Sequence, residues 1–231
     1  MLERIREIVK NRDEDQRANQ TQDCVDQSYR APVRHRETAF HGVVWDIRRD
    51  TFELDAGGKR QELTREYMAH PGAVAVLALN DRDQVAMVRQ YRHPVSTFCW
   101  EIPAGLLDVC GESLVAAAQR ELAEEAGLEA KDWQILVDHF STSGASTEGT
   151  RIFLAREVAQ IPEENRAELH AEEVGMQLHW VDRDRVIQAV LAGEIHNANT
   201  IMAVMSYTVG STQPSWPVRE LDDKWLGRSG A

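Results

Sequence analysis

The sequence has little cysteine and no long apolar run. Its three cysteines, Cys24, Cys99 and Cys110, are odd in number and lack the spacing of a metal site. We therefore expect free thiols in a reducing cytoplasm rather than a disulfide framework. No apolar run approaches the ~18 residues that span a bilayer, and the N-terminus is charged rather than signal-like. We expect neither a membrane partner nor a secretion signal.

Basic residues are also scarce. The chain of 231 residues has 26 Lys and Arg against 38 Asp and Glu, which gives a formal net charge of −12. A basic patch supplies most of the affinity for a nucleic-acid duplex, so we expect no nucleic-acid partner. The hydrophobic content of 42% is enough for one good core and a small appendage.

What the chain does have is a dense acidic stretch from Arg120 to Gly127, R-E-L-A-E-E-A-G. The Ala-rich run before it predicts a helix with Ser113 as N-cap and Gly127 as the left-handed residue that ends it. Three apolar residues at helical spacing form the expected buried stripe: Leu114, Ala118 and Leu122.

The glutamates of this helix have two interpretations. Glu121 and Glu125 lie one turn apart beside the buried stripe, with Glu124 at their border and Arg120 four residues before it. Such a cluster is either a solvated helix face or a site for hard cations, which take oxygen ligands. Glu112 is half a turn out of phase with Glu121, so it joins the cluster only from the preceding loop.

The stretch resembles the signature box of the Nudix hydrolases, G-x5-E-x7-R-E-U-x-E-E-x-G-U, where U is aliphatic. One departure is that six residues, not five, separate Gly105 from Glu112. The extra residue falls in a loop, where an insertion costs little. A box with this longer loop resembles some bacterial ADP-ribose pyrophosphatases. The matching residues are Gly105, Glu112, Arg120, Glu121, Leu122, Glu124, Glu125, Gly127 and Leu128.

The resemblance implies an α/β (α+β) Nudix fold, with a mixed β-sheet sandwiched between helices and a small N-terminal antiparallel β-sheet subdomain. It also implies hydrolysis of a nucleoside diphosphate derivative with Mg²⁺, for which Mn²⁺ is a possible substitute. Glu121 and Glu125 are then the first metal ligands, with Glu112, Glu124 and the carbonyl of Ala104 completing the set. Gly105, Arg120 and Gly127 are the structural residues of the box.

Segments before the box narrow the subfamily. HPGAVAVLAL predicts a buried strand that ends in a turn, and VRQYRHP lies in the returning strand. Together with WEIPAGLLD they resemble the ADP-ribose pyrophosphatase branch. Arg89 and Arg92 are candidates to hold phosphate oxygens, since guanidinium geometry suits bidentate contact. The alternative is a surface strand with solvated charges.

Two segments after the box add candidates. Ser141 to Glu148 resembles a family stretch whose glutamate approaches the substrate or the metals, so Glu148 is a substrate-side candidate. In relatives, a glutamate on a mobile loop before a later strand acts as general base, which favours Glu172, with Glu173 second. The length and polarity of this loop suit a lid. Ordinary solvated loop charges are the alternative for all three.

The chain is predicted to have four parts. Residues 1–35 are a charged, loosely ordered extension with one possible short helix. Residues 36–65 form the N-terminal β subdomain, with strands in HGVVWDIRRD and TFELDAGG. Residues 66–210 form the Nudix domain, which includes helices at Arg183 to Ala192 and from about Asn199. Residues 211–231 are a tail that packs on the body or on a partner.

Close relatives exchange the N-terminal sheet between two subunits, and aromatic residues there stack on adenine. We therefore expect a domain-swapped homodimer with Trp45 stacking on adenine, while a buried core tryptophan is the alternative. The expected activity is hydrolysis of ADP-ribose to AMP and ribose 5-phosphate. The alternatives are another nucleotide substrate, such as a nucleotide sugar or a dinucleotide, and a non-catalytic nucleotide-sensing module.

Overall fold

The computed structural model describes residues 24–166, 176–216 and 219–225. The chain separates into two compact units, residues 1–32 and residues 33–231. In the first unit, residues 24–32 have no regular secondary structure, and the short helix expected near the N-terminus lies outside the described residues.

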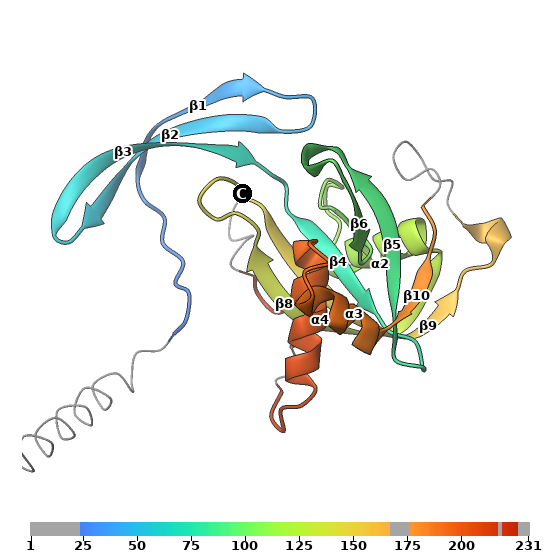
Figure 1. Ribbon diagram of the computed structural model, residues 1–231. Coiled ribbons are helices and arrows are strands. Elements are labelled where there is room, and N and C mark those ends of the chain that lie inside the picture. The colour runs from blue at the N-terminus through green and yellow to red at the C-terminus, as the bar shows by residue number, and fades with distance from the viewer. Residues whose placement is uncertain (1–23, 167–175, 217–218, 226–231) are drawn as a thin grey trace, which may run out of the picture. The chain divides into compact units, whose positions relative to one another are not determined.

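A mixed four-stranded sheet is the centre of the second unit, with the strand order β7-β4-β9-β8 (Figure 1). β4 and β9 are parallel, while β7 and β8 pair antiparallel to β4 and β9 respectively. All six residues of β4 are buried, as the continuous apolar run predicts. The strands are β4 (Ala73–Ala78), β7 (Ala104–Leu106), β8 (Leu128–Phe140) and β9 (Gly149–Gln160).

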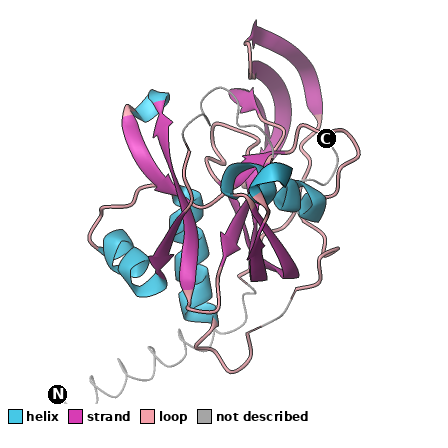
Figure 2. Ribbon diagram, turned by 90° about the vertical axis from the view of Figure 1, so that its right-hand side faces the viewer, coloured by secondary structure: helices cyan, strands magenta, loops and turns pink. Residues whose placement is uncertain are grey.

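Helices cover both faces of this sheet (Figure 2). On one face, α2 (Leu114–Ala126) packs Ala118 and Leu122 against the sheet. On the other, α3 (Arg183–Leu191) and α4 (Ala198–Gly210) enclose a second apolar cluster. The expected sandwich of a mixed sheet between helices is confirmed.

A second sheet has the strand order β10-β5-β6 and stands beside the first. The turn at Asn80 is present, since its side chain accepts hydrogen bonds from the backbone N–H groups of Arg82 and Gln84 at 2.9 and 3.1 Å. The strand after that turn does not return into the sheet of β4, however. It starts the second sheet instead, whose strands are β5 (Gln84–Arg92), β6 (Thr97–Glu101) and β10 (His179–Asp182).

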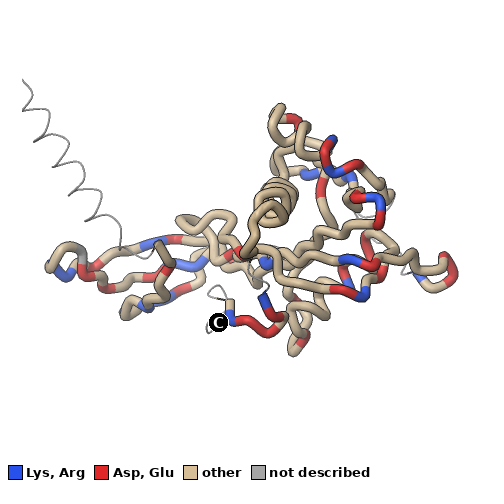
Figure 3. Tube along the Cα trace, turned by 90° about the horizontal axis from the view of Figure 1, so that it is seen from below, with Lys and Arg blue, Asp and Glu red and all other residues tan. Residues whose placement is uncertain are grey.

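The N-terminal sheet has three antiparallel strands, not the two expected: β1 (Val33–His41), β2 (Asp46–Ala56) and β3 (Lys59–Ala69). The predicted break between Asp50 and Thr51 is wrong, because both lie inside β2. β1 also begins within the stretch expected to be loosely ordered. Basic and acidic residues alternate along this sheet (Figure 3), and ion pairs such as Arg36 with Asp50, at 2.7 Å, link its strands.

The C-terminal segment packs on the body of this unit. The ring of Trp216 lies 5.8 Å from that of Tyr207 on α4. Trp225 is buried at 9% exposure in the apolar cluster beneath α2. No helix in the described ranges is both long and apolar enough to span a membrane.

Candidate active site

Helix α2 presents its glutamates beside the core because its two ends are fixed. The side chain of Ser113 accepts a hydrogen bond from the backbone N–H of Ala116 at 3.2 Å, and Gly127 ends the helix with a φ of 62°. With Leu122 fully buried against the sheet, Glu121 and Glu125 lie at its border, at 7% and 9% exposure. Both predicted caps are confirmed, and they set the register of the acidic row.

Arg120 gathers the remaining carboxylates. Its Nε and Nη2 atoms donate to the two oxygens of Glu112, both at 3.1 Å. Its Nη1 atom donates to Glu121 at 2.6 Å and to Glu124 at 3.1 Å. The hydrogen bonds to Glu112 are the largest of the effects that raise the pKa of Arg120 above its ordinary value. Glu112 thus joins the cluster from the loop, despite the additional residue there.

Strand β7 contacts Glu121 and Glu125 of the acidic row. The backbone N–H of Ala104 donates to Oε2 of Glu125 at 2.8 Å. The next residue, Gly105, faces Glu121 so closely that a Cβ atom on it would overlap the carboxylate. The glycine is therefore required because Glu121 occupies the space that a side chain would fill.

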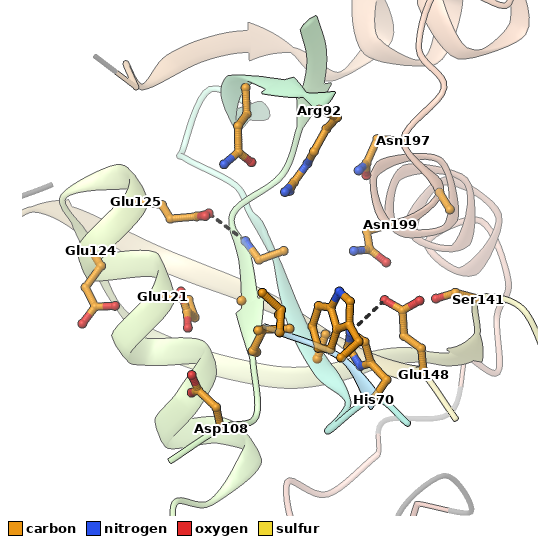
Figure 4. Close-up of a pocket in the computed structure, with 18 of the residues that line it drawn as sticks. His70, Arg92, Asp108, Glu121, Glu124, Glu125, Ser141, Glu148, Asn197 and Asn199 are labelled. Atoms are coloured by element: carbon orange, nitrogen blue, oxygen red, sulfur yellow. Dashed lines mark hydrogen bonds and ion pairs between the residues drawn. The ribbon is translucent and has the colours of Figure 1, made fainter. Parts of the chain in front are cut away.

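These residues form one wall of a pocket of about 690 Å³ (Figure 4). Glu121, Glu124 and Glu125 approach it from α2, and Asn197 and Asn199 approach from the N-terminal end of α4. The predicted site residues that line it are Trp45, Arg92, Ala104, Gly105, Arg120, Glu121, Glu124, Glu125 and Glu148.

Trp45 lies in the turn between β1 and β2 and reaches the pocket together with Val44. Its indole stacks on the imidazole of His70, with ring centroids 4.4 Å apart and planes 23° apart. Glu148 faces the same histidine, with 3.7 Å between its Oε1 atom and Nε2 of His70. The structure therefore brings Trp45 and Glu148 together at the pocket through a residue that the sequence did not single out.

The two arginines of β5 have different positions. Arg92 lines the pocket and donates two hydrogen bonds to the buried Glu101, at 2.9 and 2.7 Å. Arg89 does not belong to the pocket, because successive side chains of a strand point to opposite faces. Its guanidinium carbon lies 5.0 Å from the ring centroid of Phe98 instead. The placement of Arg89 among the phosphate ligands is not supported by the pocket of this chain.

Other candidates are harder to find from sequence. Glu172 and Glu173, the predicted bases, lie outside the described residues. Six polar residues that were not among the predicted site residues line the pocket: His70, Gln90, Asp108, Ser141, Asn197 and Asn199. His70 is the first residue of HPGAVAVLAL, and Asp108 is the last residue of WEIPAGLLD. Both segments resemble the ADP-ribose pyrophosphatase branch, and this resemblance could have pointed to the two residues. The two asparagines lie at the start of α4, where an asparagine is an ordinary N-cap residue and gives no sign of a binding site.

The donor set fits a hard divalent cation. Its members are carboxylates and a backbone carbonyl, all oxygen ligands of the kind that Mg²⁺ takes. Within the described ranges, no three acidic, cysteine or histidine side chains already converge as a metal site. Glu112, Glu121 and Glu124 instead gather around the guanidinium of Arg120. The absence of a side chain at Gly105 leaves room for the Glu121 carboxylate beside β7, where its oxygens are of the kind such an ion takes.

Comparison with known proteins agrees with this geometry. The model of the NUDIX domain matches residues 69–203. An ADP-ribose pyrophosphatase of Mycobacterium tuberculosis is 41% identical over 195 residues, which cover 83% of this chain and 89% of that protein. An ADP-ribose pyrophosphatase of Bacillus subtilis is 34% identical over 169 residues, 73% of this chain and 88% of that protein.

Two further similarities complete the comparison. A methanol dehydrogenase activator of Bacillus methanolicus is 34% identical over 168 residues, 73% of this chain and 87% of that protein. A crystal structure of an ADP compounds hydrolase superposes with a TM-score of 0.63 at 18% identity, covering 80% of this chain and 96% of that one, and so supports the fold. With the box helix, the sandwiched sheet and the domain match in agreement, the chain belongs to the Nudix hydrolase family.

Proposed function

We propose that this protein hydrolyses the pyrophosphate bond of ADP-ribose to give AMP and ribose 5-phosphate. The observation that carries the proposal is the composition of the 690 Å³ pocket, which both the glutamates of α2 and the indole of Trp45 line. A nucleoside diphosphate sugar has a charged pyrophosphate and an aromatic base, and the two walls offer a counterpart for each. The 41% identical relative named ADP-ribose pyrophosphatase supports the choice of substrate.

Mg²⁺ is the proposed cofactor, with Mn²⁺ as a possible substitute. Glu112, Glu121, Glu124, Glu125 and the carbonyl of Ala104 would hold it. When bound, such ions neutralise the pyrophosphate and lower the pKa of a water that becomes the nucleophile. Arg120, which holds three of these glutamates in the structure, keeps the cluster assembled.

The remaining chemistry is an in-line displacement. A water oxygen forms a bond to one phosphorus, and the bond from that phosphorus to the bridging oxygen breaks. We assign the removal of the water proton to Glu172, or to Glu173 in its place. Glu121 and Glu124 are assigned to the catalytic machinery because both face the pocket from α2.

Substrate contacts are assigned to the opposite wall. Trp45 would stack on the adenine, a contact worth ~1–3 kcal/mol per base in single-stranded nucleic acids. Glu148 faces the same part of the pocket and is assigned to the ribose side. We assign Arg92 to the phosphate end, and in support it lines the pocket and is oriented by its hydrogen bonds with Glu101.

We further propose a homodimer in which the N-terminal sheets are exchanged. In support, Phe40, Val43 and Val44 near the β1–β2 turn are exposed at 63%, 105% and 65%, a cost that a second subunit would relieve. Sedimentation at nanomolar concentration tests this, because a fully active monomer would contradict it. The free Cys24, Cys99 and Cys110 support a cytoplasmic location.

The proposed activity is tested by assaying released phosphate compounds with Mg²⁺ against a panel of substrates. The panel contains ADP-ribose, NADH, diadenosine polyphosphates, nucleotide sugars and nucleoside triphosphates. We expect the highest kcat/KM with ADP-ribose and equal amounts of AMP and ribose 5-phosphate. A higher kcat/KM with a nucleotide sugar or a dinucleotide would mean that this compound, not ADP-ribose, is the substrate. Absence of turnover with every compound of the panel would contradict the enzymatic function.

A further inference from the structure

His70 occupies the junction between the two substrate-side residues of the pocket. It follows β3 directly, and its side chain is 5% exposed. One face of the imidazole stacks on Trp45 at 4.4 Å, and its Nε2 atom lies 3.7 Å from the Glu148 carboxylate (Figure 4). No other described residue has both contacts.

The tautomer of this histidine follows from its hydrogen bond. The backbone N–H of Gly72 donates to Nδ1 of His70 at 3.0 Å, so Nδ1 carries no proton. In the neutral ring the proton is then on Nε2, which faces Glu148. Burial lowers the pKa of His70, while the charge of Glu148 acts in the opposite direction. Near neutral pH the ring is therefore a neutral donor directed at a carboxylate.

The backbone around His70 is hydrogen-bonded to the loop that carries Glu148. The N–H of His70 donates to Oγ1 of Thr147 at 2.8 Å, and the Thr147 hydroxyl donates to the His70 carbonyl at 3.0 Å. The N–H of Met68 donates to the Ala145 carbonyl at 2.9 Å, and the N–H of Thr147 donates to the Met68 carbonyl at 3.0 Å. The imidazole thus has little freedom to move relative to Glu148.

We propose that His70 is a positioning residue that holds the Trp45 ring and the Glu148 carboxylate in place on one side of the pocket, where the two groups contact the same nucleotide. The inference rests on the proposed function, because it takes the adenosine half of the substrate as the ligand between these two groups. His70 itself lies behind Trp45 and beside Glu148, away from the acidic row of α2. Its loss is therefore expected to weaken nucleotide binding far more than it slows the chemical step.

Three variants separate the two contacts. His70→Phe keeps a ring against Trp45 but removes both nitrogens. His70→Asn keeps an acceptor for the N–H of Gly72 but removes the ring and the Nε2 donor. His70→Ala removes both the ring and the two nitrogens. The matched control is His179→Phe, because His179 also packs against an indole, that of Trp100 at 5.0 Å, but does not line the pocket.

We expect His70→Ala to raise the KM for ADP-ribose about 10-fold, which corresponds to ~1.4 kcal/mol of binding free energy. The kcat should change less than about 3-fold, because His70 does not belong to the acidic row. His70→Phe and His70→Asn should each restore part of the loss. His179→Phe should leave KM unchanged. A loss confined to kcat, or a KM for His70→Phe and His70→Asn no different from wild type, would overturn the inference.

Binding without turnover keeps this test separate from the proposed function. AMP contains the adenosine half but no pyrophosphate, so its Kd can be measured by calorimetry whether or not ADP-ribose is hydrolysed. We expect the Kd to rise with the His70 variants in the same order as KM. Absence of AMP binding by the wild type, or equal Kd values for wild type and His70→Phe, would overturn the inference. Absence of ADP-ribose turnover alone would overturn only the proposed function.

Discussion

The position of Glu121 depends on the absence of a side chain at Gly105. Because a Cβ atom there would overlap the carboxylate, Gly105→Ala must displace Glu121 from its place beside β7. Misplacement of a catalytic group by ~1 Å can cost about 100-fold in rate, so we expect kcat to fall by about this factor with little change in Tm. Gly144→Ala is the control, since a Cβ atom on Gly144 would meet open space. A Gly105→Ala enzyme with wild-type kcat would contradict the assignment of Glu121.

Arg120 compensates the charge of three glutamates, so its loss leaves like charges close together. The side chain is 28% exposed. We expect Arg120→Ala to lower the free energy of unfolding in EDTA by about 1–3 kcal/mol, less than a fully buried pair would lose.

Calorimetry with and without Mg²⁺ tests this account of Arg120. Mg²⁺ should raise the Tm of Arg120→Ala by more than it raises the Tm of the wild type, because the cation takes over the compensation. Arg185→Ala is the control, since its pair with Glu194 is exposed on both sides, at 65% and 56%. An Arg120→Ala protein as stable in EDTA as the control would show that the cluster does not depend on Arg120.

At the scale of elements, the C-terminal segment supports the strands that carry the site. The ring of Trp225 packs on Gly149, where a Cβ atom would lie 2.6 Å from it, and reaches Gly72. These glycines begin or precede β9 and β4, next to Glu148 and near His70. Arg151 adds its guanidinium 5.7 Å from the same ring and donates to the Asp223 carbonyl at 2.8 Å.

Trp225→Ala is therefore expected to be strongly destabilising. Removing a buried aromatic side chain costs about 3–5 kcal/mol, and each kcal/mol lowers the Tm of a domain this size by about 2–4 °C. Thermal melting measures the effect, with the neighbouring Lys224→Ala as the exposed control. Equal Tm values for the two variants would mean that the segment does not support the sheet.

The elements also differ in how far the sequence predicted them. α2 was predicted with its caps because its apolar stripe, Ser113 and Gly127 are all local signals. β1 was not, since all nine of its residues are exposed and no apolar alternation marks it. It pairs with the next strand, β2, partly through exposed ion pairs such as Arg34 with Glu53 at 2.8 Å. Ion pairs across a hairpin of exposed strands leave no apolar period in the sequence.

The site shows the same division between local and distant signals. The acidic row was predictable because one helix carries it. His70 was not, because its contacts with Trp45 and Glu148 join segments that are 25 and 78 residues away in the chain. Arg89 stays a prediction that this pocket does not support, because a strand alternates its faces and the sequence did not decide which face of β5 meets the pocket.

At the scale of the whole molecule, two histidines make stability depend on pH. Burial is the main cause that lowers the pKa of both His70 and His139 below the ordinary value of 6.5. As pH falls below this value the unfolded chain binds more protons than the folded one, so the free energy of unfolding decreases. The hydrogen bond with Arg36 lowers the pKa of Asp50 below its ordinary value of 3.8. Asp50 therefore affects the free energy of unfolding only at a lower pH than the two histidines do.

Urea unfolding at pH 7.5 and pH 5.5 tests this dependence. The wild type should be less stable at pH 5.5. The difference should shrink in His139→Phe, because both ring nitrogens of His139 lack a hydrogen-bond partner among the described residues, so the substitution removes a titrating group without removing a bond. Equal or greater stability at pH 5.5 would contradict the account.

The central claim is that the carboxylates of α2 hydrolyse a pyrophosphate bond with a divalent cation. Glu125→Gln tests it most directly, since glutamine retains an oxygen to accept the N–H of Ala104 but loses the negative charge. With Mg²⁺ and saturating ADP-ribose, we expect kcat to fall at least about 100-fold while Tm stays close to wild type. The exposed Glu129→Gln serves as the control. Near wild-type release of AMP by Glu125→Gln would contradict the claim.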